Sequence, residues 1–124
     1  MNLIDSSGWF EYFIDSPYAR HFIPVIENTE ELIVSPLNYF EIYKRIRGVF
    51  GDDEANRAVG FLKNGRVIDI NSSIAMHAAI LSKIHHLHMA DSILLATAQS
   101  EEAVLWTMDA YFKDIPGVQY IPKE

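Results

Sequence analysis

The sequence predicts an α/β fold: three layers, α/β/α, around a central parallel sheet of four to five strands. Short apolar runs alternate with longer amphipathic segments along the whole chain. Short strands separated by helical segments indicate βαβ units, because parallel strands need crossover connections. Right-handed crossovers then place helices on both faces of the sheet. A length of 124 residues, 49% of them hydrophobic, fits one domain over residues 1–124 with a substantial core.

Serines followed by proline mark helix starts in the first half of the chain. Ser16-Pro17 and Ser35-Pro36 each place a capping hydroxyl before a proline that suits the first helical turn. Ser6-Ser7 offers caps for a shorter helix that follows the first apolar run. The predicted elements are a strand at 3–4, helices at 8–14 and 17–27, a strand at 31–34 and a helix at 36–50.

Glycine, aspartate and asparagine punctuate the second half. Gly51-Asp52-Asp53 breaks one helix and caps the next, which ends near Asn64-Gly65. Asn71-Ser72-Ser73 caps another helix, and Pro116-Gly117 is a turn signal. The predicted elements are a helix at 52–64, a strand at 67–70, helices at 74–85 and 89–100, a strand at 103–106 and a further strand at 118–121.

The composition excludes several kinds of site. There is no cysteine, so disulfides, thiolate zinc sites and cysteine nucleophiles are excluded. With 10 basic and 17 acidic residues the formal net charge is −7, so general attraction to a phosphate backbone cannot explain any binding of nucleic acid. No apolar run approaches the ~18 residues that would cross a bilayer. We therefore expect a cytoplasmic protein that makes no use of a membrane and acts through a local site.

Acidic residues follow the predicted strands at their carboxyl ends, where open parallel sheets bind ligands. Asp5 comes directly after the first strand, and Asp109 lies just past the strand at 103–106. Glu41 lies in the second turn of the helix at 36–50, and Asp91 starts the Ala-rich helix at 89–100. Four acids from four distant segments are thus predicted to converge at one edge of the sheet.

Each acid also has a purely structural explanation. Asp5 and Asp91 suit helix N-caps, and Asp109 suits the first position of a turn. Glu41 precedes Arg45 by four residues, which is the spacing of a surface ion pair worth about 0.3–0.5 kcal/mol. If the four converge instead, they need a cation. Oxygen-only donors favour Mg²⁺ or Mn²⁺, ions that clamp phosphate oxygens and activate water, over Zn²⁺.

The chain resembles a PIN domain, and within that family it is most similar to VapC-type toxins. The likeness rests on LIDSSGW at 3–9, ADSILLATA at 90–98 and WTMD at 106–109, with Glu41 between the first two and Phe112 after the last. Order, spacing and total length agree over the whole chain.

The resemblance implies a Mg²⁺- or Mn²⁺-dependent endoribonuclease that is commonly dimeric and is restrained by an antitoxin partner. It assigns the metal and the catalysis to four acids and a supporting role to small hydroxyl residues beside them. The acids are Asp5, Glu41, Asp91 and Asp109, and the supporting residues are Ser6 or Ser7 and Thr107. Family members often carry a further acid where this chain has Tyr111 and Phe112, which gives weight to a catalytically inactive PIN-like binding module as the alternative.

Basic and aromatic residues near the predicted site suggest further contacts. Lys44, Arg45 and Arg47 form a basic patch beyond Glu41, and in an acidic protein they are the best candidates to hold an RNA backbone. Most such charges are simply solvated. Aromatic residues crowd the early helices, so we expect an exposed apolar surface there and an isologous dimer. These aromatics are Trp9, Phe10, Phe13, Tyr18 and Phe22.

Two other functions fit the sequence less well. A phosphoacceptor domain would need paired acids at the first strand, and Asp5 has no acidic neighbour. The cluster of histidines from His77 to His88 lacks the i,i+4 spacing of a helical zinc site in the pairs His77–His85, His85–His86 and His86–His88.

Overall fold

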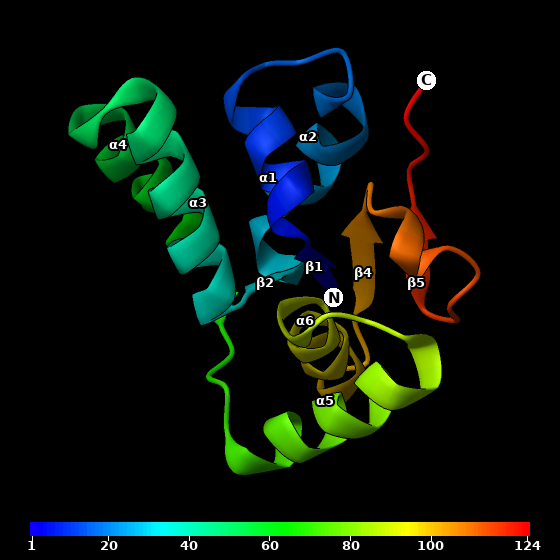
Figure 1. Cartoon of the computed structure of the whole chain (residues 1–124). Coiled ribbons are helices and arrows are strands. Elements are labelled where there is room, and N and C mark those ends of the chain that lie inside the picture. The colour runs from blue at the N-terminus through cyan, green and yellow to red at the C-terminus, as the bar shows by residue number, and fades with distance from the viewer.

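The computed structural model describes all 124 residues and contains one five-stranded parallel sheet (Figure 1). Its strand order is β3-β2-β1-β4-β5. The strands are β1 (Asn2–Ile4), β2 (Leu32–Val34), β3 (Arg66–Val67), β4 (Val104–Thr107) and β5 (Val118–Tyr120). The helices are α1 (Ser6–Phe13), α2 (Ala19–Glu27), α3 (Pro36–Phe50), α4 (Asp52–Leu62), α5 (Ser72–His85) and α6 (Met89–Ser100).

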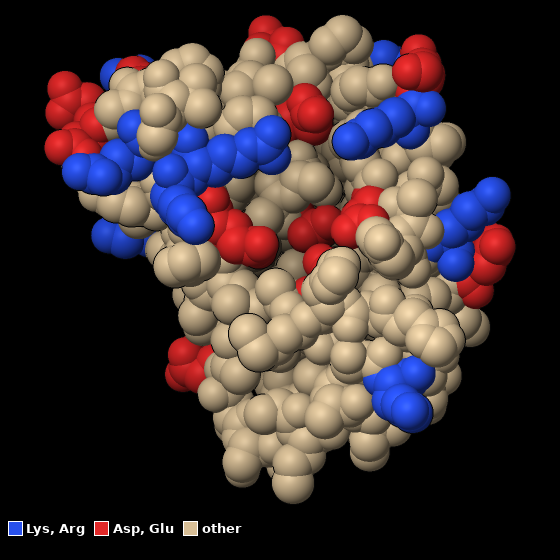
Figure 2. Space-filling view, viewed as in Figure 1, with Lys and Arg blue, Asp and Glu red and all other residues tan.

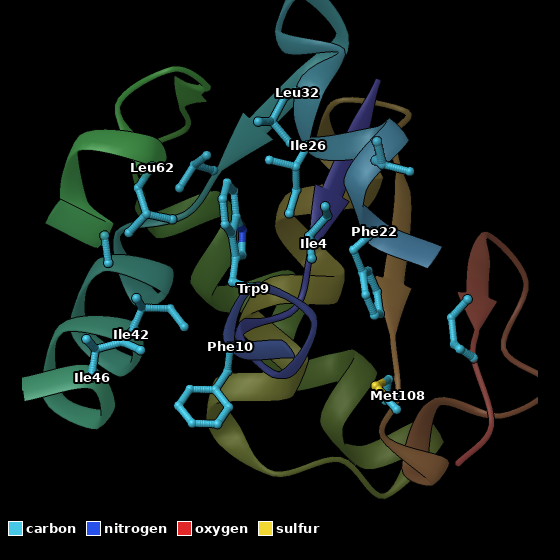
Figure 3. Close-up of a cluster of buried hydrophobic side chains, with 14 of the residues drawn as sticks. Ile4, Trp9, Phe10, Phe22, Ile26, Leu32, Ile42, Ile46, Leu62 and Met108 are labelled. Carbon is cyan, nitrogen blue, oxygen red and sulfur yellow. The ribbon is translucent and has the colours of Figure 1, made fainter. Parts of the chain in front are cut away.

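Helices cover both faces of the sheet, which confirms the predicted three layers. α1 to α4 pack on one face, and α5 and α6 pack on the other (Figure 1). Consecutive residues of the central strand β1 serve the two cores in turn, since Ile4 belongs to the first cluster and Leu3 to the second. Figure 3 shows Ile4, Trp9 and Leu62 among the side chains of the first cluster. Leu3 and Ile4 of β1 and all three residues of β2 are therefore apolar, because both faces of the sheet are covered there.

The strand order places the switch point between β1 and β4. The chain builds β1, β2 and β3 outward in one direction, then returns to add β4 and β5 on the other side of β1. Leu3 pairs with Ile33 of β2 and with Leu105 of β4. The carboxyl ends of β1 and β4 therefore lie side by side, with Asp5 and Asp109 in the segments that follow them.

Two of the predicted helix starts are confirmed in detail. The Ser35 Oγ accepts a hydrogen bond from the Leu37 amide at 3.1 Å, while the Asn38 Oδ1 accepts one from the Ser35 amide at 2.9 Å. This is a capping box in which asparagine takes the place of the usual glutamate or glutamine. At the start of α5, the Asn71 Oδ1 accepts from the Ile74 amide at 2.9 Å.

Several predicted boundaries differ from the observed ones. Ser6 and Ser7 do not cap α1 but form its first turn, and Asp5 stands at the N-cap position. α2 begins at Ala19, two residues after Pro17, although the Ser16 hydroxyl accepts from the Tyr18 amide at 3.1 Å as expected for a capping serine. β3 ends at Val67 instead of Ile70, because this edge strand has only β2 to pair with, and β2 ends at Val34.

Three of the five early aromatics are buried and not exposed as we predicted, while Phe13 and Tyr18 are partly buried against the same cluster. Trp9 and Phe22 are fully buried and Phe10 is only 8% exposed, because α1 and α2 press them onto the sheet. Gly8 makes that close contact possible, since a Cβ there would meet Phe22 at 2.7 Å. The large exposed apolar side chains lie on other elements, among them Met76, Ile80 and Ile84 of α5. No helix is both long enough and apolar enough to span a membrane.

Candidate metal centre

Asp5 lies at the floor of the site, directly after β1. Its amide donates to the carbonyl of Trp106 at 2.8 Å, which ties the end of β1 to β4. The residue is 6% exposed, and its Oδ2 accepts hydrogen bonds from Thr107 Oγ1 at 2.8 Å and from Ser7 Oγ at 3.0 Å. Burial raises the pKa of Asp5 even though these hydroxyls favour the charged form, and the charge of Asp109 raises that pKa further. The hydroxyls therefore offset only part of the cost of burying this carboxylate.

Glu41 reaches the same site from α3. Its Oε1 accepts a hydrogen bond from Ser6 Oγ at 2.8 Å. Burial raises the pKa of Glu41, and the charge of Asp5 raises it further against the effect of the Ser6 hydroxyl. The predicted alternative of a Glu41–Arg45 ion pair is wrong, because the guanidinium of Arg45 lies over the Phe10 ring, 3.5 Å from its centroid.

Asp91 is the acid whose pKa all three of the others raise. It occupies the first turn of α6, but the N-cap position belongs to His88, so the alternative in which Asp91 is the cap is wrong. Burial and the charges of Asp5, Asp109 and Glu41 raise the pKa of Asp91 to about 7. All three of the other acids act on this one carboxyl group, so the predicted convergence is present.

Asp109 combines a structural role with a place in the site. Its Oδ1 accepts from the Tyr111 amide at 2.9 Å, so the alternative of a turn-forming aspartate is correct as far as it goes. Its own amide donates to Thr107 Oγ1 at 3.0 Å. Thr107 Oγ1 thus accepts a hydrogen bond from the Asp109 amide and donates one to the Asp5 carboxylate.

An open pocket of about 860 Å³ contains all four acids. Figure 2 shows acidic groups on the floor of this hollow, with basic groups on both sides of it. Lys44 and Arg45 of α3 line one wall, and Tyr120 and Lys123 of the C-terminal segment contribute from another part of the chain. The other lining residues include Ser6, Ser7, Phe40, Ile42, Gly48, Met108 and Ala110.

The donor set suits a hard divalent cation. None of the ion pairs in the structure involves Asp5, Glu41, Asp91 or Asp109, so the cluster has no basic counter-charge in contact. In the present conformation no three His, Cys, Asp or Glu side chains form a ready-made metal site. The chemistry of the cluster nevertheless fits: the donors are carboxylate oxygens, and a cation among them would offset the burial and mutual repulsion that raise the pKa of Asp5, Glu41 and Asp91.

Two of the three residues of the predicted basic patch line the pocket. Lys44 and Arg45 line the pocket, as the sequence suggested, but Arg47 does not. Its side chain forms an ion pair with Asp52 at the start of α4. This exposed ion pair forms because α3 and α4 meet at a sharp glycine turn that brings the two charges together, and an RNA contact by Arg47 stays a prediction.

Sequence reasoning missed Lys123 and Asn38. Lys123 lies beyond the last strand, where no motif marks it. Asn38 is fully buried beside Ser6, and its capping box was the only available signal. At the position where a further acid was expected, Tyr111 is 59% exposed and Phe112 is fully buried in the core beneath the sheet. Neither lines the pocket, so this region adds no ligand to the site.

The profile of the PIN domain family matches residues 3–118. The chain belongs to the PIN domain family. No curated protein sequence matches the chain.

Three solved structures show how far the likeness of the fold extends. A toxin–antitoxin complex from Klebsiella pneumoniae is 24% identical, with a TM-score of 0.82 over 96% of each chain. DNA-bound VapBC from Salmonella typhimurium is 17% identical, with a TM-score of 0.77 over 98% of this chain and 96% of that one. VapC20 from Mycobacterium tuberculosis, described as a sarcin–ricin loop cleaving toxin, is 13% identical, with a TM-score of 0.70 over 88% and 92%. At these identities the likeness shows a shared fold.

Proposed function

We propose that this PIN domain is a metal-dependent endoribonuclease and the toxin of a toxin–antitoxin pair. The observation that carries the proposal is the convergence of Asp5, Glu41, Asp91 and Asp109 in one open pocket without a basic counter-charge. A structural cluster of this kind would be costly, since each carboxylate raises the energy of the others. A functional cation explains why the cost is tolerated.

The four acids are the residues that would hold Mg²⁺ or Mn²⁺. Such an ion supplies activation of water and stabilisation of charge on a phosphate group. The Thr107 and Ser7 hydroxyls orient the Asp5 carboxylate, and the Ser6 hydroxyl orients Glu41. The protein thus contributes a fixed set of oxygen donors at the switch point of the sheet.

The basic residues of the pocket suit a phosphate backbone. Lys44 and Arg45 on α3 and Lys123 after β5 carry positive charge on the walls above the acids. In a chain of net charge −7, these are the groups that can place an anionic strand over an acidic floor. RNA is the proposed substrate, and the printed description of VapC20 as a toxin that cleaves the sarcin–ricin loop supports that choice.

An antitoxin is the proposed partner. Structures with the same fold are described as VapBC and FitAB assemblies, some of them bound to DNA. A short neighbouring reading frame that encodes a small DNA-binding protein would support the pairing. A cytoplasmic location and a homodimer remain predictions, and the dimer draws little support from the early aromatics, because Trp9, Phe10 and Phe22 are buried.

The alternative is a PIN-like binding module without activity. It draws on the single acid at the fourth motif, where Tyr111 and Phe112 contribute nothing to the pocket.

One assay separates the two functions. The purified protein should cleave single-stranded RNA internally with Mg²⁺ or Mn²⁺ and should lose this activity when excess EDTA is present. The control is single-stranded DNA of the same sequence, which a ribonuclease leaves intact. Full RNA cleavage in excess EDTA would contradict metal dependence, and no cleavage with saturating Mn²⁺ would favour the binding module.

A further inference from the structure

Asn38 is the fully buried amide side chain beneath the pocket, and every polar atom on it has a partner. Its Oδ1 accepts from the Ser35 amide at 2.9 Å. Its Nδ2 donates to the Ile4 carbonyl and to Ser6 Oγ, each at 3.1 Å. One side chain thus joins the end of β1, the first turn of α1 and the first turn of α3.

Two backbone groups fix which end of the amide faces which neighbour. The Ser35 N–H can only donate, so it must face Oδ1, and the Ile4 carbonyl can only accept, so it must face Nδ2. A flipped amide would set donor against donor and acceptor against acceptor at two buried contacts. The second proton of Nδ2 is therefore directed at Ser6 Oγ.

The direction of the next hydrogen bond follows. Because Ser6 Oγ accepts from Asn38, its single proton is left for the Glu41 Oε1 at 2.8 Å. Asn38 and Glu41 both lie on α3, and Ser6 lies on α1, so the chain of bonds closes a loop between the two helices. Thr107 repeats the arrangement on Asp5, where the Asp109 amide takes the place of the Asn38 side chain.

We propose that Asn38 is a positioning residue of the acid pocket, which acts through Ser6 to hold the Glu41 carboxylate in one orientation for a divalent cation. The inference rests on the proposed metal-binding function. It goes beyond that function by assigning a role to a residue that does not line the pocket and that the sequence marks only as part of a helix cap.

The test compares Mn²⁺ binding, measured by calorimetry, in wild type and in three variants. Asn38→Leu keeps the size of the side chain and removes its donors, whereas Ser6→Ala removes only the connecting hydroxyl. Each should weaken Mn²⁺ binding about tenfold or more, as the loss of groups behind metal ligands does. The double variant should bind Mn²⁺ about as well as the single variant with the lower affinity, because both changes break the same chain of hydrogen bonds.

Asn71→Ala is the matched control. Asn71 also bonds to a backbone amide at a helix start, but it does not line the pocket. This variant should lower the melting temperature and leave the Mn²⁺ affinity within about twofold of wild type, the ordinary scatter for a distant site. Two results would overturn the proposal: Asn38→Leu that binds Mn²⁺ as wild type does, or independent losses that multiply in the double variant.

A second measurement needs no metal and covers the case in which Asn38→Leu does not fold. In NMR spectra of the wild type, both Nδ2 protons of Asn38 should exchange slowly with solvent, because both are buried and bonded. In Ser6→Ala only the proton that faces the Ile4 carbonyl should stay protected. An unchanged pair of protons in Ser6→Ala would refute the link. Absence of Mn²⁺ binding by wild type would instead refute the metal function and leave this readout intact.

Discussion

The acids of the pocket are held in two different ways. Asp5 and Glu41 each accept a hydrogen bond from at least one hydroxyl, and in both cases that hydroxyl favours the charged carboxylate. Asp91 receives no such donor, and every influence on it raises its pKa, which reaches about 7. The difference shows how one pocket can contain both carboxylates that hydroxyl donors orient and an acid that has no such donor.

The comparison implies a division of labour. Asp5 and Glu41 are oriented before any cation arrives, because their hydroxyl partners are fixed in turn by the backbone of Asp109 or by Asn38. Asp91 is repelled by all three of the other acids, and a cation would stabilise its charged form. Changes at Asp5 or its hydroxyl partner should therefore mainly affect cleavage and metal affinity, whereas a change at Asp91 should also alter the pH dependence of stability.

The largest effect is expected from Asp5→Asn. This variant keeps the shape of the side chain and removes the charge on the most buried acid of the four. The rate of RNA cleavage should fall at least about a hundredfold, equivalent to about 2.7 kcal/mol in the barrier. Single-turnover cleavage with saturating Mn²⁺ measures it. A rate within a few-fold of wild type would remove Asp5 from the site.

Thr107→Val should have a smaller effect, on metal affinity. The change removes the hydroxyl that connects the Asp109 amide to Asp5, and Mn²⁺ binding should weaken about tenfold. Thr97→Val is the control, because Thr97 is equally buried but donates only to the Ile93 carbonyl within α6. If both variants bind Mn²⁺ alike, the hydroxyl does not orient Asp5.

Asp91→Asn tests the other side of the comparison through stability. The pKa of Asp91 is about 7 in the native chain against 3.8 for an ordinary aspartate, so the native state binds more protons than the unfolded state between these values. The stability of the metal-free wild type should therefore fall as the pH rises from about 4 to about 7.

Asp91→Asn should remove this loss of stability with rising pH. Its melting temperature should exceed that of metal-free wild type at pH 8 by roughly 4 °C, for about 1 kcal/mol after discounting a part-exposed group, and should differ little at pH 5. Mn²⁺ at a hundred times its dissociation constant should stabilise wild type by about 2.7 kcal/mol and the variant much less. Thermal melts at both pH values, with and without Mn²⁺, decide it. If the melting temperatures of both proteins change with neither pH nor Mn²⁺, the acids do not repel Asp91 as proposed.

The smallest effect is expected at the pocket wall that Lys44 and Arg45 line. Lys44→Gln should reduce the salt dependence of RNA binding by about 0.7 in the slope of log K against log salt, as expected for one lost contact to a single strand. Arg47→Gln should leave the slope unchanged, because Arg47 pairs with Asp52 outside the pocket. Filter binding at several salt concentrations measures both slopes. Equal slopes for the two variants would argue against a role for this wall.

Local sequence signals determined the order of the elements and the positions of the acids. The capping signals at Ser35 and Asn71 could be predicted because a helix cap involves residues two or three apart. The convergence of Asp5 and Asp109 could be predicted because parallel strands bring their carboxyl ends to one edge of the sheet. Topology therefore supplied the site in outline.

Only the tertiary structure decided what each side chain does there. Ser6 and Ser7 suited caps equally well in the sequence, yet one bonds to Glu41, 35 residues away, and the other to Asp5. Arg47 lies outside the pocket and forms an ion pair with Asp52, which no periodicity in the sequence indicates. Asn38 became the amide beneath the pocket because the ends of β1 and β2 meet there, which leaves the Ile4 carbonyl and Ser6 within its reach. Burial and hydrogen-bond partners arise from packing between segments far apart in the chain, so they were absent from the local pattern that fixed the elements themselves.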